Sequence, residues 1–150
     1  MLDMRGQLPQ GPGAYLWRSF STVKYIVLHH SGVDVDSSAR QIALYHIGKY
    51  GWPGCGYHVV VRWDGTLEWA NDWTTMSYHV ARRNHECIGI CCPGDYTSQL
   101  PRDAQLQAAL HLARWLRQEF VPQAQIVGHR DISLPGYETA CPGQLLAGSV

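Results

Sequence analysis

The heptapeptide Lys24–His30, KYIVLHH, constrains the fold more than any other stretch of the chain. Successive side chains of a β-strand point to opposite faces of a sheet, so Val27 and His29 share one face and Leu28 lies on the other. Apolar residues on both faces are typical of a central strand that is covered on both sides. The sequence therefore predicts a sheet with helices packed against it.

The remaining elements extend this layered arrangement. Asp64-Gly65 between two apolar runs is a strong hairpin signal, and residues 71–85 read as irregular. The fold class expected is α/β, a central mixed β-sheet flanked by helices, in a single domain over 23–150 after an N-terminal arm over 1–22. The expected order is strand, helix, three strands, helix and strand, at 24–30, 38–50, 57–63, 66–70, 86–92, 103–120 and 125–128.

Composition excludes several classes of protein. Twelve Lys and Arg residues balance twelve Asp and Glu residues, which disfavours nucleic acid as a partner, because that class usually carries an excess of basic residues. No apolar run approaches the ~18 residues of a membrane-spanning helix, so no stable membrane association is expected. The polar N-terminus does not resemble a secretory signal, and the five cysteines lack the spacing of a disulfide framework. We expect a monomer with mostly reduced thiols, made in the cytosol.

Two strand-terminal histidines and one cysteine are the candidates for chemistry. His29 and His129 each stand at the end of a predicted strand. Cys141, twelve positions after His129, directly precedes a proline. Two histidines and a thiolate are compatible with a three-ligand catalytic zinc site. No CxxC or HExxH pattern is present, however, so satisfied edge histidines and a buried thiol remain an open alternative from the residues alone.

Four segments together resemble the zinc-dependent N-acetylmuramoyl-L-alanine amidases of the phage T7 lysozyme and peptidoglycan-recognition-protein type. The similarity runs from about residue 24 to 145. The family fold, a mixed sheet flanked by helices, agrees with the predicted order of elements. The segments are YIVLHHSGV (25–33), GWPGCGYHVVVRWDGTLEWAND (51–72), SYHVARRNHECIGICCPGD (77–95) and GHRDISLPGYETACPG (128–143).

This resemblance implies a zinc centre and its catalytic partners. His29, His129 and Cys141 match the metal ligands, which leaves a tetrahedral Zn²⁺ one position for water. Tyr57 of GYH matches the catalytic tyrosine, and strand alternation is expected to place it on the face of Val59. Its phenol would hydrogen-bond the attacking water or the developing oxyanion, whereas an ordinary strand tyrosine would be a core residue.

The other candidates line or shape the expected cleft. Thr139 stands where the T7-type enzymes have a lysine, and catalytic peptidoglycan-recognition proteins look similar with threonine there. It is a candidate secondary catalyst. His79 matches a family histidine near the cleft and is a candidate for substrate contact. His46 either lines the groove or packs inward. Trp52 and Asn84 match positions that contact substrate or shape loops.

The function implied is zinc-dependent hydrolysis of the amide between N-acetylmuramic acid and L-alanine in bacterial peptidoglycan. The alternative is a non-catalytic peptidoglycan-binding recognition module, whose members typically lack the cysteine or the tyrosine that this chain has as Cys141 and Tyr57. Related cytosolic recycling amidases use an aspartate in place of Cys141. A short amidase of this kind resembles a phage endolysin, made in the host cytoplasm and acting on the cell wall after the membrane is permeabilised.

Overall fold

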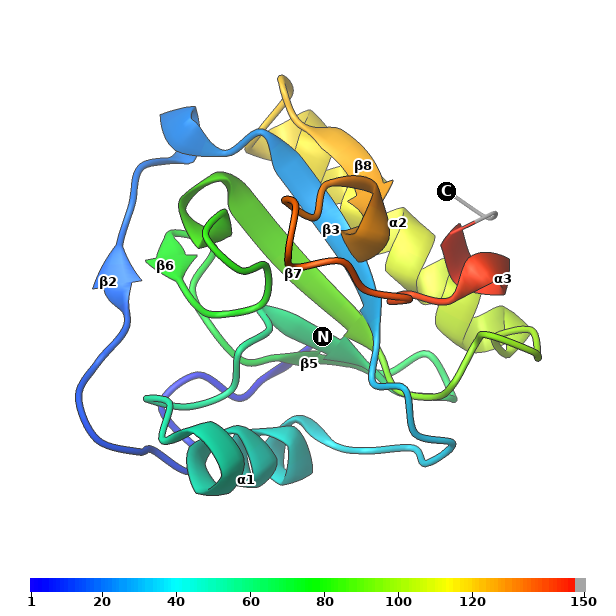
Figure 1. Ribbon diagram of the computed structural model, residues 1–150, viewed down its shortest axis with the longest axis horizontal. Helices are drawn as coiled ribbons and strands as arrows, with labels where there is room; N and C mark the ends of the chain where they lie inside the picture. The colour runs from blue at the N-terminus through cyan, green and yellow to red at the C-terminus, as the bar shows by residue number, and fades with distance from the viewer. Residues whose placement is uncertain (148–150) are drawn as a thin grey trace.

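A six-stranded sheet forms the centre of the protein, whose computed structural model describes residues 1–147 (Figure 1). Neighbouring strands are parallel except β4 and β5, which are antiparallel. The mixed sheet expected from the sequence is therefore confirmed. The strands, in their order across the sheet, are β1 (Leu2–Asp3), β5 (Leu67–Trp69), β4 (Val59–Val61), β7 (Cys87–Cys92), β3 (Tyr25–His30) and β8 (Gln125–Gly128).

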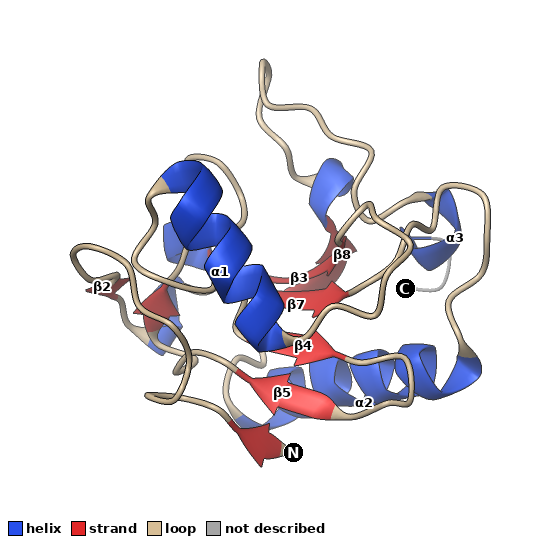
Figure 2. Ribbon diagram, turned by 90° about the horizontal axis from the view of Figure 1, so that it is seen from below, coloured by secondary structure: helices blue, strands red, loops and turns tan. Residues whose placement is uncertain are grey.

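Two helices cover opposite faces of this sheet, as Figure 2 shows. Helix α2 (Asp103–Glu119) packs on one face, where Leu28 and Ile90 belong to the larger apolar cluster. Helix α1 (Ala39–Tyr50) covers part of the other face, in a smaller cluster with Val60. A short helix, α3 (Gln144–Ala147), follows the last loop, and the 3-10 turns are η1 (Phe20–Thr22), η2 (Asn84–Glu86) and η3 (His129–Asp131).

Both long helices lie where the sequence predicts them, and local signals define the ends of α1. The Ser38 side chain accepts a hydrogen bond from the backbone N–H of Gln41, and the Gln41 side chain caps the backbone of Ser38 in return. Helix α1 ends at Gly51, whose φ of 69° is a left-handed conformation that favours glycine. Phe120, the last residue of the helix expected over 103–120, instead follows α2 as its C-cap and is 37% exposed.

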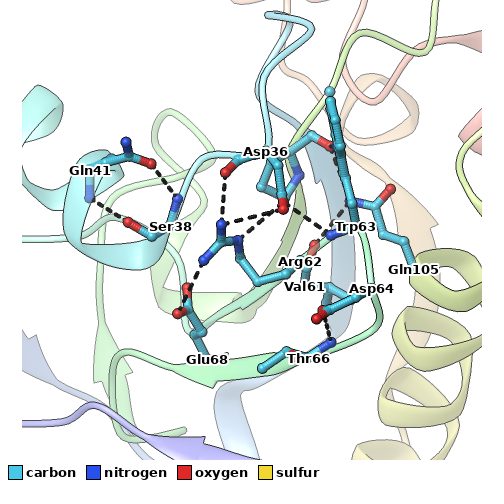
Figure 3. Close-up of polar contacts among 12 residues, drawn as sticks. Asp36, Ser38, Gln41, Val61, Arg62, Trp63, Asp64, Thr66, Glu68 and Gln105 are labelled. Atoms are coloured by element: carbon cyan, nitrogen blue, oxygen red, sulfur yellow. Dashed lines mark hydrogen bonds and ion pairs between the residues drawn. The ribbon is translucent and has the colours of Figure 1, made fainter.

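An ion-pair network fixes the start of α1 against the sheet (Figure 3). The Arg62 guanidinium contacts the carboxylates of Asp36 and Glu68, at 3.1 and 3.5 Å. Glu68 also accepts a hydrogen bond from the backbone N–H of Ala39, the first residue of α1. Asp36 accepts another from the backbone N–H of Trp63. The loop before α1 and the end of β4 are therefore held together by side chains far apart in sequence.

The N-terminal arm over 1–22 contains two short strands. Leu2–Asp3 forms β1, an edge strand parallel to β5, and Leu16–Trp17 forms β2, which pairs with β6 (Thr75–Met76) in a second, two-stranded sheet. Strand β6 lies inside the segment expected to be irregular. These strands are two residues long, too short for an alternating pattern to reveal them. None of the helices in residues 1–147 combines the length and apolar character that a membrane crossing requires.

Candidate metal centre and substrate cavity

The ends of two neighbouring parallel strands bring the candidate histidines together. Strands β3 and β8 pair in register, with Leu28 opposite Gly128. His29 lies near the carboxyl end of β3, and His129 follows β8 directly. The last loop adds Cys141, and one ligand atom from each of these three side chains lies within 4.8 Å of the other two. The described residues thus contain the three-donor cluster that the spacing alone left undecided.

Backbone contacts hold Cys141 against the strands. The backbone N–H of Arg130 donates a hydrogen bond of 2.8 Å to the carbonyl of Cys141. The backbone N–H of His30 points at the Cys141 sulfur, with 3.4 Å between N and Sγ. Gly128 leaves room for this loop, because a Cβ there would lie 2.9 Å from Cδ of Pro142. The sulfur is therefore positioned by the sheet edge as well as by its own loop.

The spacing of two of the three donors fits a tetrahedral zinc ion. The Cys141 Sγ and the His29 Nδ1 are 3.5 Å apart. Zinc–nitrogen bonds of about 2.05 Å and zinc–sulfur bonds of about 2.3 Å at the tetrahedral angle place nitrogen and sulfur about 3.5 Å apart. Two imidazoles and one thiolate are also a donor set that zinc prefers, so the residues present suit this metal.

Burial keeps the imidazoles of His29 and His129 in their neutral form. His29 is 1% exposed, and desolvation, followed by the neighbouring His79 and His129, lowers its pKa well below the usual range. Desolvation also lowers the pKa of His129 to about 4. Both histidines therefore have a free nitrogen lone pair at neutral pH. Burial raises the pKa of the Cys141 thiol to about 12, so a cation is needed to hold the thiolate form near neutrality.

Tyr57 lies beside the candidate ligands, on a different face from the one expected. Its ring centroid is 5.0 Å from that of His29. The ring packs against the cluster that contains Val60, whereas Val59 belongs to the cluster on the opposite side of the sheet. The alternation argument was wrong here because the strand begins only at Val59, after a bend at His58. Burial, the main cause, raises the pKa of Tyr57 well above its usual value, so the phenol stays protonated.

A cavity of about 460 Å³ opens over these side chains, and all nine residues singled out from the sequence line it. A second cavity of about 400 Å³ continues along α1 and shares His46, Tyr50 and Tyr57 with the first. The described residues that line the two cavities include no Lys, Arg, Asp or Glu. Together the two cavities form a groove that is neutral and rich in aromatic and histidine side chains.

Aromatic side chains form one wall of the groove. The Trp52 ring stacks on Tyr50, with centroids 4.5 Å apart, and lies 4.8 Å from the ring of His46. The Nδ1 of His46 accepts a hydrogen bond from the backbone N–H of Gly56, and burial lowers the pKa of His46 to about 4. His46 therefore lines the groove and also packs inward, so the two roles considered for it from the sequence are compatible.

Sequence reasoning missed Tyr50 and Tyr78 as lining residues. Tyr50 could have been found, because it follows His46 by four residues on α1 and so shares its face. Tyr78 lies in the segment 71–85, where no periodicity indicates which way a side chain points. Asp131, two residues after His129, accepts a hydrogen bond from the backbone N–H of Gly128.

The remaining candidates have specific hydrogen bonds. The Asn84 side-chain oxygen accepts from the backbone N–H groups of His79 and Val80, at 2.9 and 2.8 Å, so it shapes the loop at the cavity. The Thr139 hydroxyl oxygen accepts from the backbone N–H of Cys141 at 3.1 Å. His79 is 9% exposed, and its Nδ1 is 2.9 Å from the Nε2 of His29. His79 also lines the cavity, so its contact with substrate stays a prediction.

Comparison with known proteins places this architecture in a family. The pattern of the N-acetylmuramoyl-L-alanine amidase family matches residues 19–144. The chain belongs to this family. It is 30% identical to peptidoglycan recognition protein 1 of Rattus norvegicus, over 83% of this chain and 71% of the rat protein. It is 29% identical to peptidoglycan-recognition protein SC2 of Drosophila simulans, over 82% of this chain and 70% of the fly protein.

A solved endolysin structure has the same fold. The Ph2119 endolysin, from a bacteriophage of Thermus scotoductus MAT2119, superposes on this amidase-family chain with a TM-score of 0.84 and 26% identity. The match covers 99% of this chain and 97% of that one. The relatives of this amidase-family chain thus carry the names of both recognition proteins and lytic enzymes, and the two kinds share one architecture.

Proposed function

We propose that this amidase-family protein is a zinc-dependent hydrolase that cleaves the amide bond between N-acetylmuramic acid and L-alanine in bacterial peptidoglycan. The observation that carries the proposal is the cluster of His29, His129 and Cys141 beneath an open cavity. Three protein ligands leave a tetrahedral zinc one free position, which is the mark of a catalytic rather than a structural site. A zinc ion held there would activate water and polarise the scissile carbonyl.

The protein's own groups around this cluster suit an amide hydrolysis. The Tyr57 phenol, kept protonated by burial, is a hydrogen-bond donor for the oxygen that becomes negatively charged in the transition state. The oxygen of Thr139 already accepts from the backbone N–H of Cys141, so its hydroxyl proton is free to donate toward the cavity. Tyr57 and Thr139 are therefore the proposed catalytic residues beside the metal ligands.

The neutral groove suggests how the substrate is held. Without charged lining residues, recognition relies on stacking and neutral hydrogen bonds from His46, Trp52 and their neighbours, with Asn84 shaping the loop. Salt screens charge pairs but has little effect on stacking. We expect binding of purified sacculi to change by less than about threefold between 50 and 300 mM salt, where a recognition site built on ion pairs would weaken much more.

The proposal is tested by metal analysis together with mass analysis of products from purified sacculi. We expect about one zinc per chain and products with a free L-alanine amino terminus. The Cys141→Ala variant should lose both zinc and activity, while remaining folded, because a core of this size does not need a structural metal. A matched Cys92→Ala variant removes a buried thiol that lies outside the metal cluster and should retain its zinc.

A second candidate function is peptidoglycan binding without cleavage. Several relatives are named peptidoglycan-recognition proteins, which is the specific observation that favours it. Sacculi that bind the zinc-loaded protein but release no new amino termini would support this function and refute the hydrolase. Cleavage of soluble anhydro-muropeptides in preference to intact sacculi would instead indicate a recycling amidase.

We further propose that the enzyme works as a monomeric phage endolysin, made in the host cytoplasm and reaching the cell wall once the membrane is permeabilised. The similarity to the Ph2119 endolysin supports this setting. Expression inside a bacterial host should cause lysis only when a membrane-permeabilising protein is supplied as well. Light scattering of the purified protein should give the mass of one chain, and neither DNA nor lipid vesicles should bind it.

A further inference from the structure

We propose that His79 is a positioning residue that orients His29 for metal binding, rather than a residue that contacts substrate. This inference rests on the proposed zinc site. The two rings meet nearly edge to face, with centroids 5.0 Å apart and an interplanar angle of 76°. Nδ1 of His79 lies 2.9 Å from Nε2 of His29, although the residues are fifty positions apart in the chain. The hydrogen bond is therefore a product of the tertiary fold.

The two ring nitrogens of His29 face different partners, so the hydrogen bond with His79 affects which nitrogen is free to bind a metal. Nδ1 faces the sulfur of Cys141 at 3.5 Å, whereas Nε2 faces His79. If the proton of His29 is on Nε2, where His79 can accept it, the lone pair of Nδ1 points toward the metal cluster. The opposite tautomer would place a proton where the metal must bind. Hydrogen bonds of this kind fix both the tautomer and the ring orientation of ligand histidines.

The surroundings hold the ring of His79 in place. Gly89 in β7 lies directly beneath it, and a Cβ at Gly89 would be 2.6 Å from Nδ1 of His79. The Asn84 side chain fixes the backbone of His79 at 2.9 Å. The ring of His58 packs against it at a centroid distance of 5.6 Å and an angle of 90°. Ring, backbone and neighbours therefore determine where Nδ1 points.

The other ring nitrogen indicates that this arrangement has a cost. Within the described part of the chain, Nε2 of His79 is buried without a hydrogen-bond partner. An unpaired buried polar group costs about 1–3 kcal/mol. A leucine at this position would avoid that cost but would leave Nε2 of His29 without a partner, so burial alone does not account for a histidine. The contact between Nδ1 and His29 does account for it.

Substitutions that keep or remove the acceptor test the inference. The side chain of asparagine places a polar atom near the position of Nδ1, so His79→Asn retains an acceptor, whereas His79→Leu removes it. Zinc affinity, measured by competition with a chelator, should fall about 10–100-fold in His79→Leu, the range typical for loss of such a partner. It should stay within about threefold of the wild type in His79→Asn. Gly89→Ala, which displaces the ring, should weaken binding as His79→Leu does.

Two further measurements separate positioning from a general structural effect. The absorption spectrum of the cobalt-substituted protein should change in His79→Leu and be preserved in His79→Asn. The metal-free variants should unfold within about 5 °C of the metal-free wild type, because a change of about 1 kcal/mol shifts the melting temperature of a chain this long by a few degrees. His111→Leu, on the exposed side of α2, is the control and should alter none of these values.

The outcomes distinguish this inference from the proposed function. Zinc binding by the wild type with unchanged affinity in His79→Leu would overturn the positioning role and leave the hydrolase proposal intact. Equal losses in His79→Leu and His79→Asn would also overturn it, because the acceptor would then be irrelevant. Failure of the wild type itself to bind zinc would overturn the proposed function and this role together.

Discussion

Lowering the pH from 7 to 5 should destabilise the protein, because the folded state keeps the imidazole of His58 neutral. His58 is fully buried. Its Nδ1 accepts a hydrogen bond of 3.0 Å from the backbone N–H of Gly89, and its Nε2 donates one of 2.7 Å to the carbonyl of Thr75. Burial, and then the positive charge of Arg18, lower its pKa to about 3. The folded protein therefore holds this imidazole neutral well into the acid range.

The magnitude follows from the difference between the folded and unfolded states. An unfolded histidine has a pKa of about 6.5, so between about pH 3 and 6.5 the unfolded chain binds one more proton than the folded protein. Stability is therefore full above pH 6.5 and falls as the pH drops, by about 1.4 kcal/mol per pH unit. From pH 7 to 5 the loss assigned to His58 is about 2 kcal/mol. His46 acts in the same direction, because burial lowers its pKa to about 4.

Urea denaturation of the wild type and of His58→Asn at pH 7, 6 and 5, at constant ionic strength, measures this loss. Asparagine keeps an acceptor for the N–H of Gly89 but cannot be protonated. The variant should be less stable at pH 7, yet its free energy of unfolding should fall by about 2 kcal/mol less than that of the wild type by pH 5. His111→Asn, at an exposed position, should follow the wild type. Parallel pH profiles for the wild type and His58→Asn would refute the reasoning.

Three other substitutions test the candidate site and its frame. Tyr57→Phe should lower turnover about 10²–10³-fold with zinc still bound, since one oxyanion donor is lost; near wild-type turnover would make Tyr57 a packing residue. Thr139→Val removes one neutral hydrogen bond worth about 0.5–1.5 kcal/mol, so turnover should fall about tenfold or less. A thousandfold loss of turnover would mean that Thr139 is a principal catalyst. Arg62→Met leaves the Asp36 carboxylate without its partner and should cost about 1–3 kcal/mol in urea denaturation, whereas Arg40→Met, at an exposed position, should cost much less.

Local patterns predicted the parts of the fold that depend on local forces. The strand at 24–30 was evident from its apolar residues, and β8 lies at the predicted 125–128. The start of α1 was visible in Ser38, because a capping residue acts within one turn. His29 and His129 were recognisable as candidates because each stands at the end of a strand that the local pattern predicts.

Other features could not be predicted, because they depend on contacts between distant segments. The edge strand at Leu2–Asp3 exists only through pairing with β5. The face of Tyr57 depends on a bend that the alternating pattern does not reveal. The partner of His79 is a histidine fifty residues earlier in the chain, and only the folded sheet brings the rings together. Cys141 was assigned through the family resemblance, since its loop has no periodic signal.

The origin of the three candidate ligands divides the site into a fixed and an exchangeable part. His29 belongs to β3 and His129 directly follows β8, so the paired strands of the central sheet position both imidazoles. The sulfur is supplied by the last loop, whose sequence can vary while β3 and β8 stay paired. Metal preference can therefore be tuned at one position: Cys141→Asp exchanges a soft donor for a hard one and should narrow the preference for zinc over manganese while the sheet stays unchanged.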